Sequence, residues 1–275
     1  MRKFIYYVLF TLIIACNDDD SHSINDITAP IITVLGDTTI SIPKNTIYID
    51  AGATAIDNVD GDLTSSIITI SNVDTSALGF YTVTYSVSDT EGNNSSASRL
   101  VTVFESPVVG DLKNGGYVVW VNPADPSKGL VSALVDQSTD IRGVVWYDGD
   151  FNTLPETGAT STAIGTGSSN TDALIVAQGS GSYAAQLCAD YSVTVDGITY
   201  DDWFLPSKDE LNLLYLQHTL IGGFTDDVTT EIYGDYYWSS SESSKYNAWE
   251  QDFFDGSDET SDKNYPNLVR AVRAY

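Results

Sequence analysis

Basic residues are scarce in this chain of 275 residues, which has 12 Lys and Arg against 38 Asp and Glu. The formal net charge is therefore −26 at pH 7. A charge of this size repels nucleic acid and anionic lipid headgroups, so we exclude nucleic acid as a partner. The same excess of carboxylates favours cations, notably Ca²⁺, whose ligands are hard oxygen atoms.

Cysteine and histidine are also rare, with two residues of each. If Cys16 carries lipid, Cys188 has no intramolecular partner, which excludes a disulfide framework and predicts a buried, small apolar residue. The only histidine beyond residue 22 is His218, in a predicted helix and away from any nucleophile motif. We therefore expect no enzymatic activity, although an acidic chain always offers carboxylate pairs of the kind that a glycosidase uses.

No apolar run is long enough to span a bilayer, which takes about 20 residues. The N-terminal apolar run, residues 4–15, follows Arg2 and Lys3 and stops at Cys16, which is typical of a signal peptide over residues 1–15. Cleavage would leave 275 − 15 = 260 residues and a formal charge of −26 − 2 = −28. That length predicts about two domains.

The residues LIIAC at 12–16 resemble the lipobox of bacterial lipoproteins. The resemblance implies that Cys16 becomes the lipid-modified N-terminus and anchors the chain through several acyl chains. The acidic run NDDDS at 17–21 resembles the surface-export signal of Bacteroidota-type lipoproteins, and a solvated tether explains it equally well. We expect an outer-membrane, cell-surface location with attachment to the membrane through the lipid.

Residues 16–29 are polar and lack apolar periodicity, which predicts an acidic tether. An all-β domain is predicted over 30–104, because β-rich runs alternate with turn residues at regular spacing. Its clearest strand lies within 79–89, where tyrosine and valine alternate with threonine and serine. The predicted strands are 31–35, 38–42, 67–70, 81–88 and 100–104.

This strand, the motif DNVDGD at 57–62 and the turn at 89–93 together resemble the bacterial Ig-like module that is also found in insecticidal crystal proteins. The resemblance covers residues 29–104 and implies an Ig-like β-sandwich. It places Tyr81 where Ig-like folds have a tyrosine corner, whose hydroxyl bonds to backbone across the end of the sandwich.

Three aspartates of the same motif, Asp57, Asp60 and Asp62, could bind Ca²⁺ at the end of this domain. Their order does not fit an EF-hand loop, which needs ligands at alternating positions followed by its glycine. A plain Asx turn is the favoured alternative.

A loss of pattern at 105–115, with Pro107 and Gly110, predicts a linker, and a second domain is expected over 116–275. Its strand-like runs and helices predict an α+β fold. The loop 148–171, rich in Gly, Thr and Ser, is a candidate rim of a binding site. Helices are predicted at 171–178, at 183–191 and after a capping box at 207–210, and strands at 116–121, 129–135, 143–147, 236–240, 248–254 and 268–273.

Four ordered motifs, GSGSYAA at 179–185, WFLPSKDEL at 203–211, YWSSSE at 237–242 and VRAVR at 269–273, resemble the Lcl C-terminal domain family. That family is named for a Legionella collagen-like adhesin and is similar to C-type lectin-like domains and to the formylglycine-generating enzyme fold. The resemblance covers about residues 110–275. It implies an α+β, C-type lectin-like fold and attachment to extracellular polysaccharide.

The chain departs from the chemistry of related folds in several ways. The enzymatic branch holds copper with a cysteine pair, whereas this domain has only Cys188. Lectins that chelate sugar through Ca²⁺ carry Glu-Pro-Asn or Gln-Pro-Asp, whereas the nearest motif here is Tyr-Pro-Asn at 265–267. Eleven acidic residues accompany one base, Lys245, within 225–262, so a neutral or cation-bridged glycan is expected rather than a sulfated one.

Aromatic residues near this acidic segment are the candidate glycan ligands, since sugar C–H faces stack on rings. They are Tyr236, Tyr246, Trp249 and Phe254. Core packing is the alternative, and it is favoured for the tryptophans at 203, 238 and 249. We also expect Arg270 and Arg273 to pair with carboxylates.

A second possible Ca²⁺ site is the carboxylate cluster made of Asp252, Asp255, Asp258 and Glu259, with a solvated acidic loop as the favoured alternative. Two functions are consistent with the sequence as a whole. The first is a surface lipoprotein that binds or adheres to extracellular glycan. The alternative is a structural or protein-interaction lipoprotein of the cell envelope with no glycan ligand.

Overall fold

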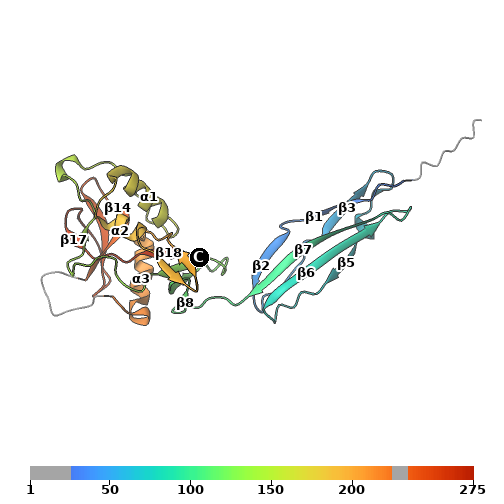
Figure 1. Cartoon of the computed structure of the whole chain (residues 1–275), viewed down its shortest axis with the longest axis horizontal. Helices are drawn as coiled ribbons and strands as arrows, with labels where there is room; N and C mark the ends of the chain where they lie inside the picture. The colour runs from blue at the N-terminus through green and yellow to red at the C-terminus, as the bar shows by residue number, and fades with distance from the viewer. Residues whose placement is uncertain (1–25, 225–234) are drawn as a thin grey trace, which may run out of the picture. The chain divides into compact units, whose positions relative to one another are not determined.

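The computed structural model describes residues 26–224 and 235–275. The predicted signal peptide, Cys16 and the acidic run after it lie outside the described residues. The chain forms two compact units, the first within residues 1–100 and the second containing residues 101–275. Within the described ranges, the strands up to Phe104 and the strands from Leu112 onward belong to separate sheets (Figure 1).

Two sheets make up the first region, one of three strands in the order β1-β3-β4 and one of four strands in the order β2-β7-β6-β5. The pairs β1–β3, β3–β4 and β5–β6 are antiparallel. The predicted all-β architecture is therefore confirmed. The strands are β1 (Ile31–Val34), β2 (Thr39–Pro43), β3 (Ala53–Asp57), β4 (Gly61–Asp62), β5 (Ile68–Ser71), β6 (Gly79–Ser88) and β7 (Asn94–Phe104).

The alternation within β6 builds the core of the first region, because Val83, Tyr85 and Val87 are buried while the residues between them are more exposed. The hydroxyl of Tyr85 donates to the carboxylate of Asp50 at 2.8 Å. Buried Arg99 forms an ion pair with the same carboxylate. Tyr85 thus makes a hydroxyl contact between distant segments, although Tyr81 is the residue that the Ig-like pattern predicts for a contact of this kind.

Contacts of the first region begin earlier than the predicted boundary at residue 30. Asp26 is buried, and the side-chain amide of Asn93 donates to its backbone carbonyl at 2.9 Å. Asp26 of the predicted tether is therefore packed against the first region, although Ile27 beside it is 81% exposed. Strands β3 and β4 are absent from the predicted set, because the first buries only Ala55 and Asp57 and the second has two residues, so neither shows a clear apolar alternation.

Strands of the second region form four sheets, ordered β18-β10-β9-β8, β11-β17, β12-β13 and β14-β15-β16. Strand β8 lies within the predicted linker 105–115 and pairs with β9, so this region begins before residue 116. The strands are β8 (Leu112–Lys113), β9 (Gly116–Val121), β10 (Gly129–Ser132), β11 (Val144–Val145), β12 (Val193–Val195), β13 (Ile198–Tyr200), β14 (Tyr236–Glu242), β15 (Asn247–Asp252), β16 (Asp258–Asp262), β17 (Pro266–Asn267) and β18 (Val272–Ala274).

The helices α1 (Gly167–Gln178), α2 (Ala184–Ala189) and α3 (Lys208–Ile221) complete this region, and with them the predicted α+β fold is confirmed. At the start of α3, Ser207 Oγ accepts from the backbone N–H of Glu210, and the Glu210 carboxylate accepts from the backbone N–H of Ser207 at 2.8 Å. This is the predicted capping box. In the described part of the chain, no helix is both long and apolar enough to cross a membrane.

Two apolar clusters form the core of the second region, one around Trp146, Trp203 and Trp238 and the other around residues of α3 and Phe253. The core role predicted for Trp203 and Trp238 is therefore confirmed. Cys188 is a free, fully buried thiol, as predicted.

The predicted ion pairs of the two arginines near the C-terminus are also present. Arg270 pairs with Asp136 at 2.6 Å, and Arg273 pairs with Asp202. The first pair is buried, and the guanidinium of Arg270 also donates to the backbone carbonyl of Ala133 at 3.1 Å. These contacts hold the segment before β18 in place.

Candidate functional site

The four aromatic residues predicted to bind glycan do not converge on one surface. Tyr236 is opposite Asp252 across β14 and β15, whereas Trp249 is opposite Thr260 of β16. Side chains alternate along a strand, so Trp249 and Asp252, three positions apart on β15, lie on opposite faces of the sheet. Trp249 faces α3, where the Nζ of Lys208 lies 4.5 Å from its ring centroid. Phe254 follows β15 and is 67% exposed.

Carboxylates surround Tyr236. Burial, followed by the negative charges of Asp252 and Glu259, raises the pKa of the Tyr236 hydroxyl to about 12. Glu250 is two positions from Asp252 on β15, and the side-chain amide of Asn267 donates to its carboxylate. Burial raises the pKa of Glu250 above its ordinary value. Asn267, the asparagine of the Tyr-Pro-Asn motif, thus forms an internal hydrogen bond to Glu250.

Among the described residues, the predicted acidic cluster of the second region is not one of the places where three possible cation ligands lie within 4.8 Å of one another. Asp258 forms an ion pair with Lys208 at 2.7 Å and lies on the same face of the sheet as Trp249 of β15. Asp252 and Asp255 accept from the backbone N–H groups two residues further on, at 2.7 and 2.8 Å. Glu259 is opposite Glu250, so it lies on the other face of the sheet from Asp258.

The three aspartates of the motif at 57–62 also have separate partners. Asp60 accepts from the backbone N–H and the hydroxyl of Thr90 at 2.7 and 3.0 Å, and exposed Asp62 accepts from the N–H of Thr64 at 2.9 Å. Asp57 accepts from the backbone N–H of Val59 at 2.8 Å, as in the predicted Asx turn.

Among the described residues, the carboxylates that do come together are Asp26, Asp57 and Asp89. Sequence reasoning misses Asp26, because it lies in the predicted tether. It misses Asp89, because that residue is part of an ordinary turn sequence.

A hollow of about 300 Å³ opens on the surface of the second region, between the loop that follows Leu154 and the turn that joins β14 to β15. The loop belongs to the segment 148–171, which the sequence marks as a candidate rim. The lining residues are Glu156, Gly158 and Thr160 from the loop and Glu242, Ser243, Ser244 and Lys245 from the turn.

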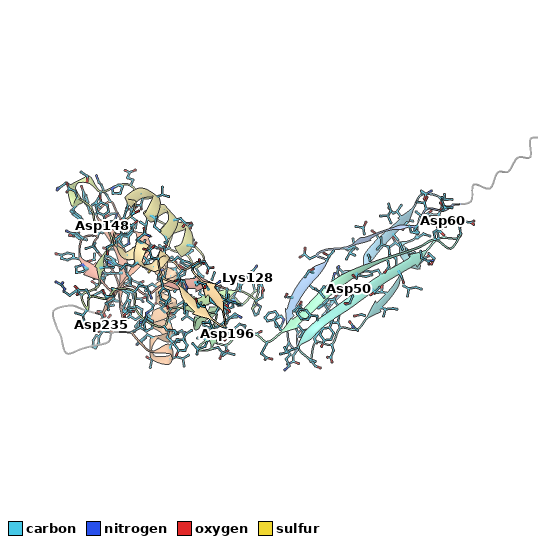
Figure 2. The ribbon with its side chains drawn as sticks, in the orientation of Figure 1. Asp50, Asp60, Lys128, Asp148, Asp196 and Asp235 are labelled. Atoms are coloured by element: carbon cyan, nitrogen blue, oxygen red, sulfur yellow. The ribbon has the colours of Figure 1, made fainter. Side chains whose placement is uncertain are left out.

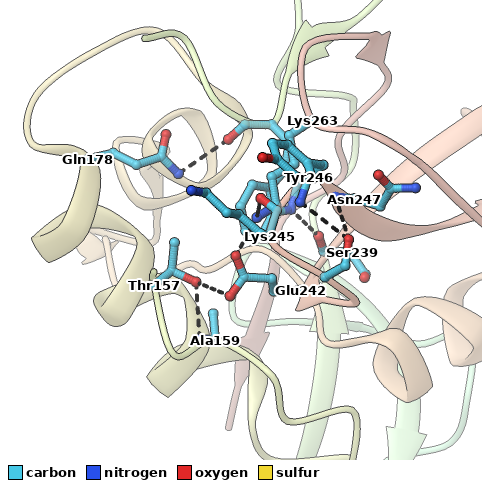
Figure 3. A network of polar contacts seen from close by, with 11 residues as sticks. Thr157, Ala159, Gln178, Ser239, Glu242, Lys245, Tyr246, Asn247 and Lys263 are labelled. Carbon is cyan, nitrogen blue, oxygen red and sulfur yellow. Dashed lines mark hydrogen bonds and ion pairs between the residues drawn. The ribbon is translucent and has the colours of Figure 1, made fainter. Parts of the chain in front are cut away.

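A buried polar network fastens the loop and the turn to each other beside this hollow (Figure 3). Fully buried Lys263 forms an ion pair with Glu242 and donates to the backbone carbonyl of Lys245 at 2.8 Å. The hydroxyl of Thr157 donates to Glu242 at 2.9 Å. Burial lowers the pKa of Lys263, and the adjacent Glu242 carboxylate opposes this effect. Since a buried charge is costly without a partner, the pair holds both segments in one arrangement.

An aromatic pair lies next to the hollow in sequence and in space. Tyr246 follows Lys245 directly, is 49% exposed, and has its ring centroid 5.7 Å from that of Phe151. The Nζ of Lys245 also lies 5.7 Å from the Tyr246 ring centroid. Of the four aromatic residues predicted to bind glycan, Tyr246 is the one that directly follows a residue lining the hollow, Lys245, although it does not line the hollow itself.

Most of the residues around this hollow are not apparent from the sequence. Glu242 lies in the predicted strand motif YWSSSE, but nothing in that motif shows that its charge is paired with Lys263. Thr157 and Glu156 are two polar residues in a polar loop. The sequence feature that points to this site is the unusual length and composition of the loop. It predicts the rim of a binding site, but it does not identify the residues that line that site.

Comparisons with known proteins agree with this architecture. Residues 32–103 match the family described as "Bacterial surface protein, Ig-like domain", and residues 140–273 match the Lcl C-terminal domain family. A stretch of 82 residues is 38% identical to the pesticidal crystal protein Cry22Aa of Bacillus thuringiensis. That match covers 25% of this chain and only 11% of the crystal protein.

Two solved structures are also similar to part of the chain. The lipoprotein BT2262 from Bacteroides thetaiotaomicron is 26% identical over 32% of this chain and 44% of its own, with a TM-score of 0.27. The structure of CBM51-2 in complex with GlcNAc and INT domains from Clostridium perfringens ZmpB is 26% identical over 38% of this chain and 21% of its own, with a TM-score of 0.24. Each likeness covers only part of either chain.

The family matches and the fold divide the chain in the same way. The match to the surface-protein family falls within the all-β region, and the match to the Lcl family falls within the α+β region. Neither family description names a reaction. The chain therefore carries a bacterial surface Ig-like domain followed by an Lcl C-terminal domain.

Proposed function

We propose that this protein is a lipid-anchored cell-surface protein whose Lcl domain binds a neutral extracellular glycan in the hollow between residues 156–160 and 242–245. The observation that carries the proposal is the composition of this hollow. Carboxylates, hydroxyls and one ammonium group line it, and the half-exposed ring of Tyr246 lies beside it.

Each of these groups suits the chemistry of a sugar. Carboxylate oxygens of exposed Glu156 accept hydrogen bonds from hydroxyls, and the ammonium of Lys245 donates to ring or hydroxyl oxygens. An aromatic ring such as that of Tyr246 packs against the C–H face of a pyranose. A volume of about 300 Å³ lies at the lower end of the range for small-molecule sites, which suits a short part of a glycan chain.

Charge favours a neutral ligand over a sulfated one. The Glu242 charge is already paired with Lys263, so Glu156 and Lys245 remain as the charged groups at the surface of the hollow. The chain as a whole carries a formal charge of −26, which repels polyanions. Anionic polysaccharides would therefore need bridging cations to bind.

The proposed location rests on the N-terminal sequence and on the first domain. The signal-like run and the lipobox-like LIIAC support lipid modification at Cys16. The Ig-like domain belongs to a family of bacterial surface proteins. A folded domain between an anchor and the Lcl domain would increase the distance at which the Lcl domain can reach a ligand.

A glycan array with and without Ca²⁺, followed by calorimetry on the best neutral ligand, tests the proposal. Tyr246→Ala and Glu156→Gln should each weaken binding by roughly threefold to tenfold, since each removes one stacking or hydrogen-bond contact. Tyr265→Ala is the matched control, because Tyr265 is also an exposed tyrosine, at 59%, and, unlike Tyr246, it does not adjoin a residue that lines the hollow. Absence of binding across a broad array, with folded protein, would contradict the proposal.

One observation favours the alternative function, a protein-interaction lipoprotein of the envelope. Edge strand β5 of the Ig-like domain exposes Ile68 and Ile70 on one face, at 63% and 66%. An exposed apolar edge strand is suited to pairing with another protein. A pull-down from membranes should then recover a reproducible protein partner that Ile68→Ser and Ile70→Ser release, while Leu216→Ser on α3 leaves it bound.

A further inference from the structure

Three aspartates from separate segments of the Ig-like domain have their carboxylates in one place. Asp26 precedes β1, Asp57 ends β3, and Asp89 follows β6. One oxygen of each lies within 4.8 Å of the corresponding oxygens of the other two. The side chains are buried, with residue exposures of 7%, 5% and 8%. This group is the aspartate triad.

Hydrogen bonds fix each member of the aspartate triad but leave two oxygens unused. Asp57 Oδ1 accepts from two backbone N–H groups at 2.8 and 2.9 Å, and Asp26 Oδ1 accepts from one at 3.0 Å. Asp89 accepts from the backbone N–H and the side-chain amide of Asn93, both at 2.7 Å. The Oδ2 atoms of Asp26 and Asp57 are buried, and neither has a hydrogen-bond partner among the described residues.

The arrangement is unfavourable for the protein alone. None of the three carboxylates forms an ion pair within residues 26–224 and 235–275. Buried like charges repel. A buried acceptor without a donor also has a desolvation cost that no hydrogen bond offsets. A cation between the three carboxylates removes both costs at once.

We propose that the aspartate triad binds one Ca²⁺ ion. Ca²⁺ takes oxygen ligands at about 2.3–2.6 Å, so two ligand atoms of one ion are at most about 5 Å apart, and the three carboxylate oxygens, all within 4.8 Å of one another, meet this condition. The site offers carboxylate oxygens, which select hard cations over thiophilic metals. Mg²⁺ fits less well, because it demands near-octahedral ligands at shorter distances.

The ion would connect the first described residues of the chain to two turns of the Ig-like domain. Hydrogen bonds from Thr90 to Asp60 already join the turn after β3 to the turn after β6. Asp60 lies at one end of the domain (Figure 2). Binding at Asp26 would add the segment before β1 to the same end, so Ca²⁺ would fix the point at which the chain enters the domain.

Calorimetry and thermal unfolding of the protein purified from residue 17 on test the assignment. Ca²⁺ should bind at one site per chain and raise the Tm of the Ig-like domain, and excess EDTA should reverse the shift. Asp57→Asn and Asp89→Asn should each weaken Ca²⁺ binding by at least about tenfold. In EDTA, Asp57→Asn should unfold no earlier than the wild type, because it removes a negative charge and its amide oxygen can keep both backbone donors of Oδ1.

Asp62→Asn is the matched control, because Asp62 belongs to the same turn and contacts only Thr64 among the described hydrogen bonds. Its affinity for Ca²⁺ should equal that of the wild type. Failure of the folded wild type to bind Ca²⁺, or an equal loss of affinity in Asp62→Asn, would overturn the assignment. Either result leaves the glycan proposal untouched, since that concerns the Lcl domain.

Discussion

Arg270 is a cation that the Lcl domain buries almost completely. It pairs with Asp136 at 2.6 Å and donates to the backbone carbonyls of Ala133 and Gly223. Burial raises the pKa of Asp136, and the guanidinium of Arg270 is the largest influence against this rise. The arginine therefore opposes protonation of the Asp136 carboxylate while it connects three segments of the chain.

Replacement of this arginine should be strongly destabilising. Arg270→Ala removes the ion-pair partner of the Asp136 carboxylate, which among the described residues keeps only the hydroxyl of Tyr237 as a donor, and leaves a cavity where the buried guanidinium was, so the free energy of unfolding should fall by about 3–5 kcal/mol. Urea unfolding followed by tryptophan fluorescence measures this change. Arg142→Ala is the control, because the Arg142–Asp140 pair is exposed and its loss should have little effect. Similar losses in the two variants would contradict the role assigned to burial.

Glu250 gives a pH-dependent prediction. Its pKa is raised, chiefly by burial, so the folded state binds a proton more tightly than the unfolded state does. Its contribution to stability is therefore most favourable below the ordinary value of 4.5, and it decreases as pH rises through the raised pKa. Glu250→Gln should then be more stable than the wild type at pH 7, by on the order of 0.5–1 kcal/mol, because it removes the cost of burying the charge and, to a lesser extent, the repulsion by Glu259 and Asp252.

Thermal unfolding at pH 3.5 and pH 7 checks this sign. The difference between Glu250→Gln and the wild type should vanish at the lower pH, where the wild-type side chain is neutral. The exposed Glu156→Gln should follow the wild type at both values. A stabilisation of Glu250→Gln that is the same at both pH values would show that charge is not its cause.

At the scale of elements, α3 depends on its first turn. The capping box satisfies backbone N–H groups that no helix can satisfy internally, and Ser207 Oγ also donates to the carbonyl of Ala163 at 3.0 Å. Glu210 accepts from the backbone N–H of Gly165 at 2.7 Å as well. The turn thus attaches α3 to the loop before α1.

Loss of this cap should weaken the Lcl domain by a measurable amount. Ser207→Ala should lower the free energy of unfolding by about 1–2 kcal/mol, because one cap hydrogen bond and one contact to the loop are lost. Ser207→Thr should restore most of the stability, because it restores the hydroxyl. Thr219→Ala in the last turn of α3 is the control, and chemical denaturation of all three variants is the measurement. Equal stability of Ser207→Ala and the wild type would contradict the capping role.

At the scale of the whole molecule, the proposed anchor predicts where the protein resides. Cys16→Ser should move the protein from the membrane fraction to the soluble fraction of cells, since one thioether-linked lipid group and the N-terminal acyl chain are lost together. Fractionation with detection of incorporated fatty acid measures both effects. Cys188→Ala should remain membrane-bound and labelled, because Cys188 is buried in the core. A Cys16→Ser protein that stays in the membrane would contradict lipid anchoring at this residue.

Local patterns in the sequence predict much of the architecture. The tyrosine and valine alternation of β6, the capping box of α3 and the division into an all-β region and an α+β region are all found in the structure. Each depends on interactions between residues a few positions apart, so the pattern that causes the element is visible in one short stretch. Strands β4 and β8, with two residues each, are too short to show such a pattern.

Both candidate sites, in contrast, depend on contacts between distant residues. Thr157 and Glu242 meet across 85 positions, and Asp26 meets Asp57 and Asp89 from a segment that resembles a tether. The sequence alone determines that this protein is acidic, and it predicts an all-β Ig-like domain, an α+β Lcl-type domain and, from the residues LIIAC, a lipid anchor. Only the tertiary structure decides which carboxylates are buried side by side and which border a surface hollow. Burial and proximity follow from how the sheets and loops pack, and the residues next to a carboxylate in the sequence do not determine either property.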